Sequence, residues 1–234
     1  MKRILGALLA LMLLLPPAAA LAEGDYDYDS IPTPNMIVVD GDDPSVVFYE
    51  RNADQKVYPA STTKIMTCII ALENGNLDDS FMVGEEVLGT TTKFTEYSSL
   101  MGLKPGETVT LRDLVYGLML VSGNDAGEAI AKHVAGSIDG FVDLMNQKAA
   151  ALGMTGTHFA NPHGVPDDNH YTTARDMAKL AAYALQNKDF CDIVETKEYV
   201  VPANNVRTEP LPLVNTDRML VPVAGDKLTT VYPY

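Results

Sequence analysis

Hydrophobic residues recur at helical spacing through the middle of the chain. After Ser61 they fall three and four residues apart, at Ile65, Met66, Ile69, Ile70 and Leu72. This period predicts an apolar helix that stops near Gly75. Thr110 and Asp113 have the spacing of a capping box, with aspartate in place of the usual glutamate. The pattern predicts further helices over residues 114–121, 125–135, 137–152 and 172–185.

Runs rich in β-branched and aromatic residues flank this helical part. Met36–Val39 and Val46–Glu50 surround the turn cluster at residues 40–44 and predict a hairpin. Residues 155–171 read as a long loop, and residues 196–234 mix short β-rich runs with prolines. The order predicts an α+β fold with helices packed on an antiparallel sheet. A two-stranded hairpin alone is marginal, so we expect the sheet to be incomplete in this chain.

The first residues have the features of a secretory signal. A basic pair precedes an apolar run at residues 4–15, Pro16-Pro17 ends the run, and Ala20-Leu21-Ala22 offers small residues for cleavage. An uncleaved anchor helix is the alternative, although the run is short for a membrane span. The expected organisation is a signal peptide at 1–22, an acidic flexible lead-in at 23–35 and a single catalytic domain at 36–234, incomplete at its C-terminal end.

The acidic composition argues against nucleic acids and anionic membrane surfaces as binding partners. The chain has 31 acidic and 17 basic residues, a net charge of −14, and loss of Lys2 and Arg3 would make it more negative. No basic footprint for nucleic acid or for an anionic membrane surface is present. Export permits disulfides, but only Cys68 and Cys191 are available. Two buried thiols or a single bridge both fit the sequence.

The start of the first predicted helix carries candidate chemistry. Ser61 and Lys64 are three residues apart and therefore share a helix face. Lys64 could take a proton from Ser61 only if its pKa falls by about three units, or about 4 kcal/mol, through burial or a nearby positive charge. The unpaired N–H groups of a helix start could hold an oxyanion. However, serine is also a common N-cap, and Ser-x-x-Lys arises by chance in chains of this length.

A second polar pair stands in the break between two later helices. Ser122-Gly123-Asn124 follows the apolar run at 114–121 and precedes the helix at 125–135. A hydroxyl and a carboxamide projecting from such a turn could shuttle a proton and bind a substrate amide. The same tripeptide in a loop is often only a turn and a helix cap.

Several stretches together resemble the serine D-alanyl-D-alanine carboxypeptidases. These are low-molecular-mass penicillin-binding proteins with the β-lactamase/transpeptidase fold. The similar stretches are PASTTKIMT (59–67), LMLVSGNDA (118–126), YERNADQKVYPAS (49–61), FANPHGVPDDNHYTTARDMAKLA (159–181) and VNTDRML (214–220). They span most of residues 36–220, and the first two occur in this order about sixty residues apart.

The resemblance implies a role for four residues. Ser61 would be the acylated nucleophile, with its own N–H forming half of the oxyanion hole, and Lys64 would be the general base. Ser122 would relay the proton to the leaving D-alanine, and Asn124 would hold the amide of the bound peptide. The resemblance implies no cofactor and no metal. It implies peptidoglycan stem peptides ending in D-Ala-D-Ala as substrates, and β-lactam antibiotics as acylating inhibitors.

The sequence departs from this family near its end. The third family motif, Lys-Thr-Gly or a variant, is not found; Lys227-Leu228-Thr229 comes nearest, and VYPY (231–234) resembles residues that precede the motif in some members. The absent strand would supply the second oxyanion donor. We therefore expect these 234 residues alone to be weakly active at best. A penicillin-recognising or cell-wall-binding remnant is the corresponding non-enzyme alternative.

Other enzyme classes have weaker support. A class A β-lactamase would share Ser-x-x-Lys, but Glu-x-x-Leu-Asn does not occur and Gly123 replaces the aspartate of Ser-Asp-Asn. A metallohydrolase could use a loop rich in possible ligands, namely His158, His163, Asp167, Asp168 and His170. The chain lacks the Gly-x-Ser-x-Gly motif of many Ser-His-Asp hydrolases, and His133 and His163 are expected to be structural.

We therefore expect an exported D,D-carboxypeptidase of the periplasm or cell-wall space, with no membrane anchor in this chain.

Overall fold

The computed structural model describes residues 28–89, 94–218, 220 and 221. Contacts divide the chain into two units, Met1–Pro34 and Asn35–Tyr234. In the first unit the described part forms a single 3-10 turn, η1 (Tyr28–Ser30). The expected signal peptide and the part of the late β-rich segment after residue 221, which includes Lys227-Leu228-Thr229 and VYPY, lie outside the described residues.

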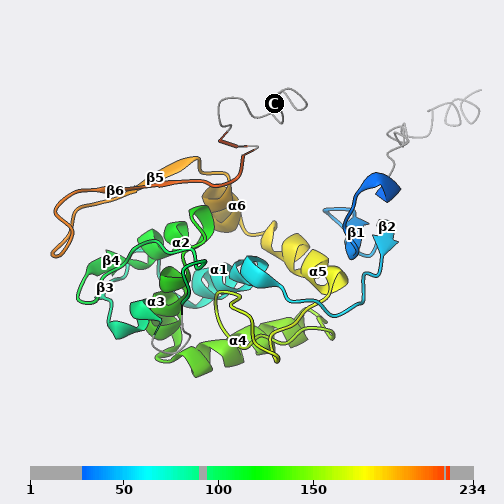
Figure 1. Cartoon of the computed structure of the whole chain (residues 1–234), viewed down its shortest axis with the longest axis horizontal. Helices are drawn as coiled ribbons and strands as arrows, with labels where there is room; N and C mark the ends of the chain where they lie inside the picture. Colours follow the sequence, from blue (N-terminus) through cyan, green and yellow to red (C-terminus); the bar gives the residue numbers. More distant parts are fainter. Residues whose placement is uncertain (1–27, 90–93, 219, 222–234) are drawn as a thin grey trace, which may run out of the picture. The chain divides into compact units, whose positions relative to one another are not determined.

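Helix α1 (Thr63–Asn74) is the central helix of the second unit (Figure 1). Eight of its twelve residues are buried, which agrees with the apolar pattern after Ser61. It contacts each of the other described helices: α2 (Leu111–Leu120), α3 (Asn124–Ala135), α4 (Ile138–Ala151), α5 (Ala174–Ala184) and α6 (Lys188–Val194). The hydrophobic core therefore surrounds the helix that follows the candidate nucleophile.

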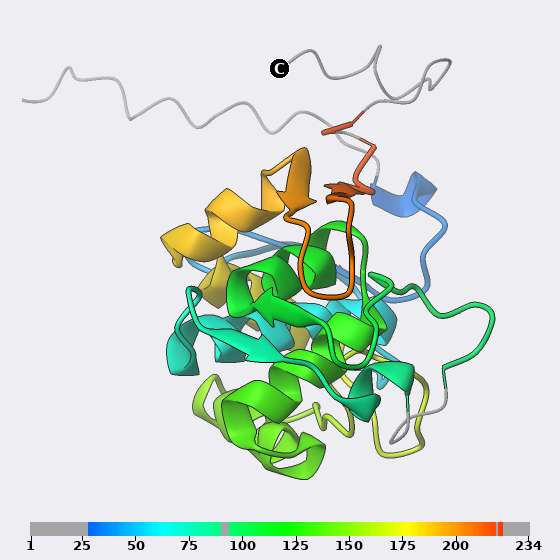
Figure 2. The same ribbon diagram turned by 90° about the vertical axis from the view of Figure 1, so that its left-hand side faces the viewer.

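The strands of the described residues form three separate antiparallel pairs (Figures 1 and 2). The predicted hairpin is present as β1 (Met36–Val39) and β2 (Val47–Arg51). The other two pairs are β3 (Ser80–Met82) with β4 (Thr108–Thr110), and β5 (Glu198–Val201) with β6 (Leu211–Val214). Helices together with small antiparallel sheets confirm the α+β prediction.

Most predicted helices form close to their expected bounds. The capping box at Thr110 is present, with reciprocal bonds between the Thr110 and Asp113 side chains and backbones. Helix α5 begins later than predicted, because Thr173 rather than Thr172 accepts the capping bond, from the N–H of Asp176. Thr172 instead pairs its backbone with Val57 in an isolated bridge.

Some elements of the structure were not predicted from the sequence. Strands β3 and β4 have three residues each and are far apart along the chain, so neither shows an alternating pattern long enough to recognise. Helix α6 has seven residues and lies within a stretch with no predicted structure. The 3-10 turn η3 (Glu85–Leu88) was also not predicted.

The two cysteines are both free thiols. Cys68 is fully buried on α1, and this burial raises the pKa of its thiol. Cys191 on α6 is partly exposed, and its thiol donates to the carbonyl of Leu185. The possible disulfide is therefore not formed.

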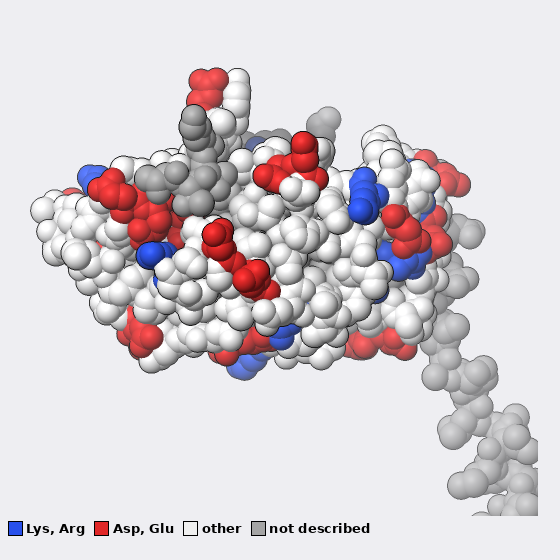
Figure 3. Space-filling view, turned by 90° about the horizontal axis from the view of Figure 1, so that it is seen from below, with Lys and Arg blue, Asp and Glu red and all other residues white. Residues whose placement is uncertain are grey.

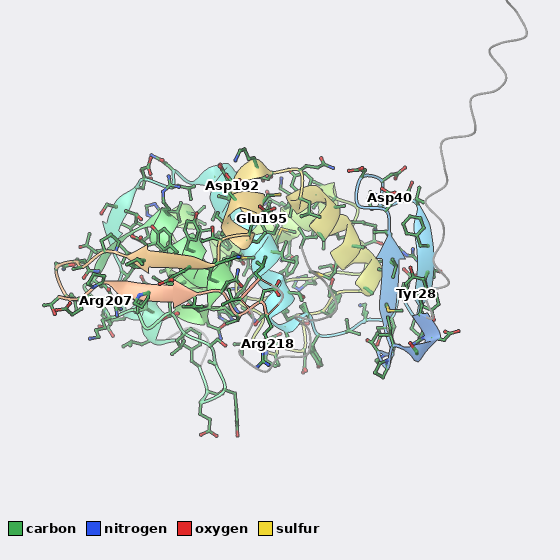
Figure 4. All side chains as sticks on the ribbon, turned by 90° about the horizontal axis from the view of Figure 1, so that it is seen from above. Tyr28, Asp40, Asp192, Glu195, Arg207 and Arg218 are labelled. Carbon is green, nitrogen blue, oxygen red and sulfur yellow. The ribbon has the colours of Figure 1, made fainter. Side chains whose placement is uncertain are left out.

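Acidic side chains are prominent on the face of the molecule drawn in Figure 3, where they outnumber the basic ones. This agrees with the net charge of the sequence. Among the described residues, no helix is both long enough and apolar enough to span a membrane. Away from the candidate site, Arg207 in the β5–β6 connection reaches the buried carboxylate of Glu107, 3.0 Å away (Figure 4).

Candidate active site

Ser61 lies in the 3-10 turn η2 (Ala60–Thr62), which leads directly into α1. Its side chain is not the helix cap: Thr62 occupies the N-cap position and makes no side-chain capping bond. The residue before it, Ala60, has φ = 47°, a left-handed conformation that costs an alanine conformational energy. The turn leaves Ser61 exposed, one helical turn away from buried Lys64.

The amine of Lys64 meets three oxygen atoms. Its Nζ lies 3.2 Å from Ser61 Oγ, 2.7 Å from Asn124 Oδ1 and 2.9 Å from the carbonyl oxygen of His163. The residue is only 2% exposed. Burial lowers the pKa of Lys64 to about 8, while the charge of Asp125 acts in the opposite direction. A neutral amine has two N–H groups and one lone pair, which matches two obligate acceptors and one hydroxyl.

Ser122 approaches Ser61 from the break between α2 and α3. Its Oγ lies 3.1 Å from Ser61 Oγ, and its backbone is left-handed, with φ = 58°. Helix α3 then begins at Asn124, which is 6% exposed and points its Oδ1 at Lys64. The structure therefore brings Ser61, Lys64, Ser122 and Asn124, the four residues singled out by the resemblance, together.

The residue after Asn124 fixes this break in place. The buried carboxylate of Asp125 accepts hydrogen bonds from the backbone N–H groups of Met101, Gly102 and Leu103, at 2.8–2.9 Å. The N–H of Asn124 in turn donates to the carbonyl of Ser99. Sequence reasoning singled out Asn124 but not Asp125, because its partners lie more than twenty residues earlier in the chain.

The loop at residues 161–164 forms the opposite side of the site. Asn161 Oδ1 accepts from the N–H groups of His163 and Gly164, and Thr67 donates from α1 to the carbonyl of Pro162. Gly164 lies against the backbone just before Ser61: a Cβ there would be 1.8 Å from the carbonyl oxygen of Ala60, and φ is +92°. Only glycine allows this approach.

The histidines of the metallohydrolase alternative have separate partners. His163 Nε2 lies 3.2 Å from Glu128 Oε1, and His158 Nδ1 contacts the carbonyl of Asn169. His170 bonds Thr63 through Nε2 and accepts from the Ala160 N–H through Nδ1, and burial lowers its pKa to about 4. Among the described residues, no group of three or more His, Cys, Asp or Glu side chains is placed to hold a metal ion.

His133 lies away from this region. Its ring stacks on Phe81, with the two centroids 3.8 Å apart, and its Nε2 is 3.6 Å from an oxygen of Asp79. It packs the end of α3 onto β3, which confirms the expected structural position. His163 differs, because its backbone carbonyl directly contacts the Lys64 amine.

A family model described as D-alanyl-D-alanine carboxypeptidase, peptidase S11, matches residues 23–226. The chain belongs to this family. Sequence relatives include D-alanyl-D-alanine carboxypeptidase DacF of Bacillus subtilis, 33% identical over 94% of this chain, and DacC of Escherichia coli, 39% identical over 73%. The matches cover 57% and 44% of these two relatives, so the chain spans about half of their length.

Solved structures of the family agree with the fold. A D-alanyl-D-alanine carboxypeptidase from Mycobacterium tuberculosis H37Rv superposes with a TM-score of 0.72 at 32% identity, covering 82% of this chain and 69% of that one. Penicillin binding protein 5 from Haemophilus influenzae gives a TM-score of 0.69 at 30% identity, covering 80% and 53%. The fold class implied by the motifs is thus confirmed as that of the penicillin-binding D,D-peptidases.

Proposed function

We propose that this protein is a serine D,D-carboxypeptidase that removes the terminal D-alanine of peptidoglycan stem peptides through an acyl-enzyme at Ser61. The observation that carries the proposal is the environment of Lys64: its amine is buried, has a pKa near 8 and lies 3.2 Å from Ser61 Oγ. Family membership and the names of the relatives support the same reaction.

In the proposed acylation step the neutral amine of Lys64 takes the proton of the Ser61 hydroxyl. Ser61 Oγ bonds to the carbonyl carbon of the D-Ala-D-Ala peptide, and the carbonyl oxygen becomes an oxyanion next to the N–H of Ser61. Asn124 offers its carboxamide nitrogen to the substrate backbone, because its Oδ1 is already bonded to Lys64.

Ser122 would complete the proton path. Its hydroxyl lies 3.1 Å from Ser61 Oγ, so a proton held by Lys64 can reach the leaving nitrogen through the hydroxyl groups. The carbon–nitrogen bond breaks, and D-alanine leaves with a neutral amine. Water then attacks the ester at Ser61 while Lys64 takes one of the water protons. The Ser61 alkoxide leaves and accepts that proton from Lys64, and the shortened peptide passes its acid proton to the solvent and is released as a carboxylate. No cofactor takes part in either step.

Mass spectrometry of the penicillin-treated protein tests this proposal. We expect one covalent adduct on Ser61, slow release of the penicilloyl group, and no adduct in Ser61→Ala. An unmodified wild-type protein would contradict a working acylation site and favour a cell-wall-binding remnant. Rapid hydrolysis of penicillin would instead favour a β-lactamase.

The same proposal includes the domain organisation and the location. Residues 1–22 would act as a signal peptide, residues 23–35 as a lead-in and residues 36–234 as catalytic domain, so that the enzyme meets peptidoglycan in the periplasm or cell-wall space. β-lactam antibiotics would acylate the same serine, consistent with the penicillin-binding protein among the structural neighbours. N-terminal sequencing of the exported protein would show whether cleavage follows Ala22.

A further inference from the structure

Glu128 is a fully buried carboxylate that the proposed reaction does not use. It lies on α3, one turn after Asn124, and both it and its partner His163 have 0% side-chain exposure. Its Oε1 contacts His163 Nε2 at 3.2 Å, whereas its Oε2 has no hydrogen-bond partner among the residues that the structure describes. Leaving such an oxygen unpaired costs about 1–3 kcal/mol, so the presence of a carboxylate at this buried position needs an explanation.

The imidazole of His163 is oriented by two contacts. Its Nδ1 accepts from the N–H of Val165, which places the ring proton on Nε2 and directs it at Glu128. Burial is the main cause that lowers the pKa of His163. The charge of the nearby Lys64 also lowers it, whereas Glu128 acts to raise it. A neutral ring therefore donates one hydrogen bond to the carboxylate and accepts one from its own loop.

The backbone of the same residue holds the Lys64 amine. The His163 carbonyl lies 2.9 Å from Nζ, so movement of this loop would move one of the three oxygens that surround the amine. The loop packs closely on α3: a Cβ added at Gly127 would lie 3.4 Å from the carbonyl of Pro162 and 3.5 Å from His163 Cβ. A side chain on α3 can thus set the position of the loop.

We propose that Glu128 is a positioning residue of the acylation site, acting through the His163 side chain to fix the carbonyl that holds Lys64. This inference rests on the proposed function. The carboxylate touches neither Ser61 nor the amine. It anchors the loop whose backbone receives one Lys64 N–H, so that the amine's lone pair stays directed at the Ser61 hydroxyl.

Loss of this anchor has a specific consequence for Lys64. If the loop loosens, its carbonyl retreats and water reaches the amine, so the burial that favours the neutral form weakens. The pKa of Lys64 then rises from about 8 toward the ordinary value of 10.5. At pH 7 each unit of increase lowers the neutral fraction, and with it the acylation rate, about tenfold.

The experiment is a titration of Lys64 in the full chain by the 13C shift of its Cε, assigned with Lys64→Ala, together with penicillin acylation rates. Glu128→Leu removes the acceptor, and we expect a rise of about one unit in the Lys64 pKa. Glu128→Gln keeps an acceptor oxygen for Nε2 and should titrate like the parent. Glu128→Asp draws the carboxylate back by one methylene and should give a smaller rise, which can be measured even if the leucine variant does not fold.

Glu107→Leu is the matched control, because Glu107 is also 0% exposed and is paired with Arg207. It should lower the melting temperature without moving the Lys64 pKa. The proposal is overturned if folded Glu128→Leu and Glu128→Asp titrate like the parent, or if Glu107→Leu shifts Lys64 equally. The Lys64 titration needs no turnover, so failure of the acylation chemistry itself would appear separately, as an unmodified parent protein.

Discussion

Each end of helix α1 holds a lysine amine, and the pKa values of the two amines are shifted in opposite directions. At the start, burial lowers the pKa of Lys64 to about 8. At the end, Glu73 holds Lys148 from α4 at 2.6 Å, and Tyr183 from α5 completes the group. Burial works against the charge of Lys148 as well, but its bonds to Glu73 and Tyr183 outweigh burial and raise its pKa.

The difference lies in the charge of the atoms that the amine touches. The amine of Lys148 contacts a carboxylate, whereas the amine of Lys64 contacts a hydroxyl, a carboxamide oxygen and a backbone carbonyl. Asp125 is close enough to affect Lys64, but its oxygens accept backbone N–H groups instead. A lysine becomes a base where the fold surrounds it with neutral oxygens and little water.

The largest expected effect comes from Lys64→Met, which keeps the bulk of the side chain and removes the amine. Acylation of Ser61 by penicillin should fall about 10²–10⁴-fold, the usual contribution of a general base. The rate is measured with a fluorescent penicillin under single-turnover conditions. A variant that still acylates at the parent rate would show that Lys64 is not the base.

The same substitution should change the dependence of stability on pH. The folded-state pKa of Lys64 is lower than its unfolded value, so the unfolded chain binds more protons between the two values and the parent gains stability as pH rises. Lys64→Met lacks this pH dependence. The free energy of unfolding of the variant minus that of the parent should therefore be about 2 kcal/mol more favourable to the variant at pH 7 than at pH 10. Denaturant unfolding of both proteins at the two pH values measures this change. If the stability difference between variant and parent were the same at pH 7 and pH 10, the lowered pKa of Lys64 would be contradicted.

Asn124→Asp would give Lys64 the environment of Lys148. A carboxylate would replace the oxygen that lies 2.7 Å from Nζ, so the pKa of Lys64 should rise and acylation at pH 7 should fall about 10–100-fold. The pH–rate profile is the measurement, and its rising limb should move to higher pH. Asn124→Ala is the control, which removes the carboxamide without adding charge; equal pH profiles for the two variants would refute the electrostatic explanation.

The smallest effect is expected at the other end of α1. Glu73→Gln removes the charge paired with Lys148 and should lower the free energy of unfolding by about 0.5–1 kcal/mol. Because the pair raises the pKa of Lys148, this loss should be present at neutral pH and should disappear as the pH rises through the folded-state pKa of Lys148. Acylation should change less than twofold; a larger change would show that the two ends of α1 are coupled.

The sequence predicted the elements whose signals are local. The apolar period after Ser61 gave α1 almost to its last residue, and the Thr110–Asp113 spacing gave the capping box of α2. Ser61 and Lys64 could be paired because three residues on a helix lie on one face. Their meeting with Ser122 followed only from the resemblance, since no local rule brings together residues 61 positions apart.

The parts that were missed depend on tertiary contacts. Glu128 and His163 are 35 residues apart, and His163 holds Lys64 by its backbone, which every residue type possesses. The same is true of Asp125, whose partners are main-chain N–H groups. Strands β3 and β4 pair across a long connection and are individually too short to produce a period.

The free thiol of Cys68 gives the site a built-in reporter. It lies one helical turn after Lys64, completely enclosed, and a thiol with a raised pKa reacts slowly with alkylating reagents. Cys191 is partly accessible and would react first, which provides an internal reference in the same molecule. The rate at which Cys68 becomes modified would therefore measure how often the core around α1 opens, and a bound β-lactam should slow that modification.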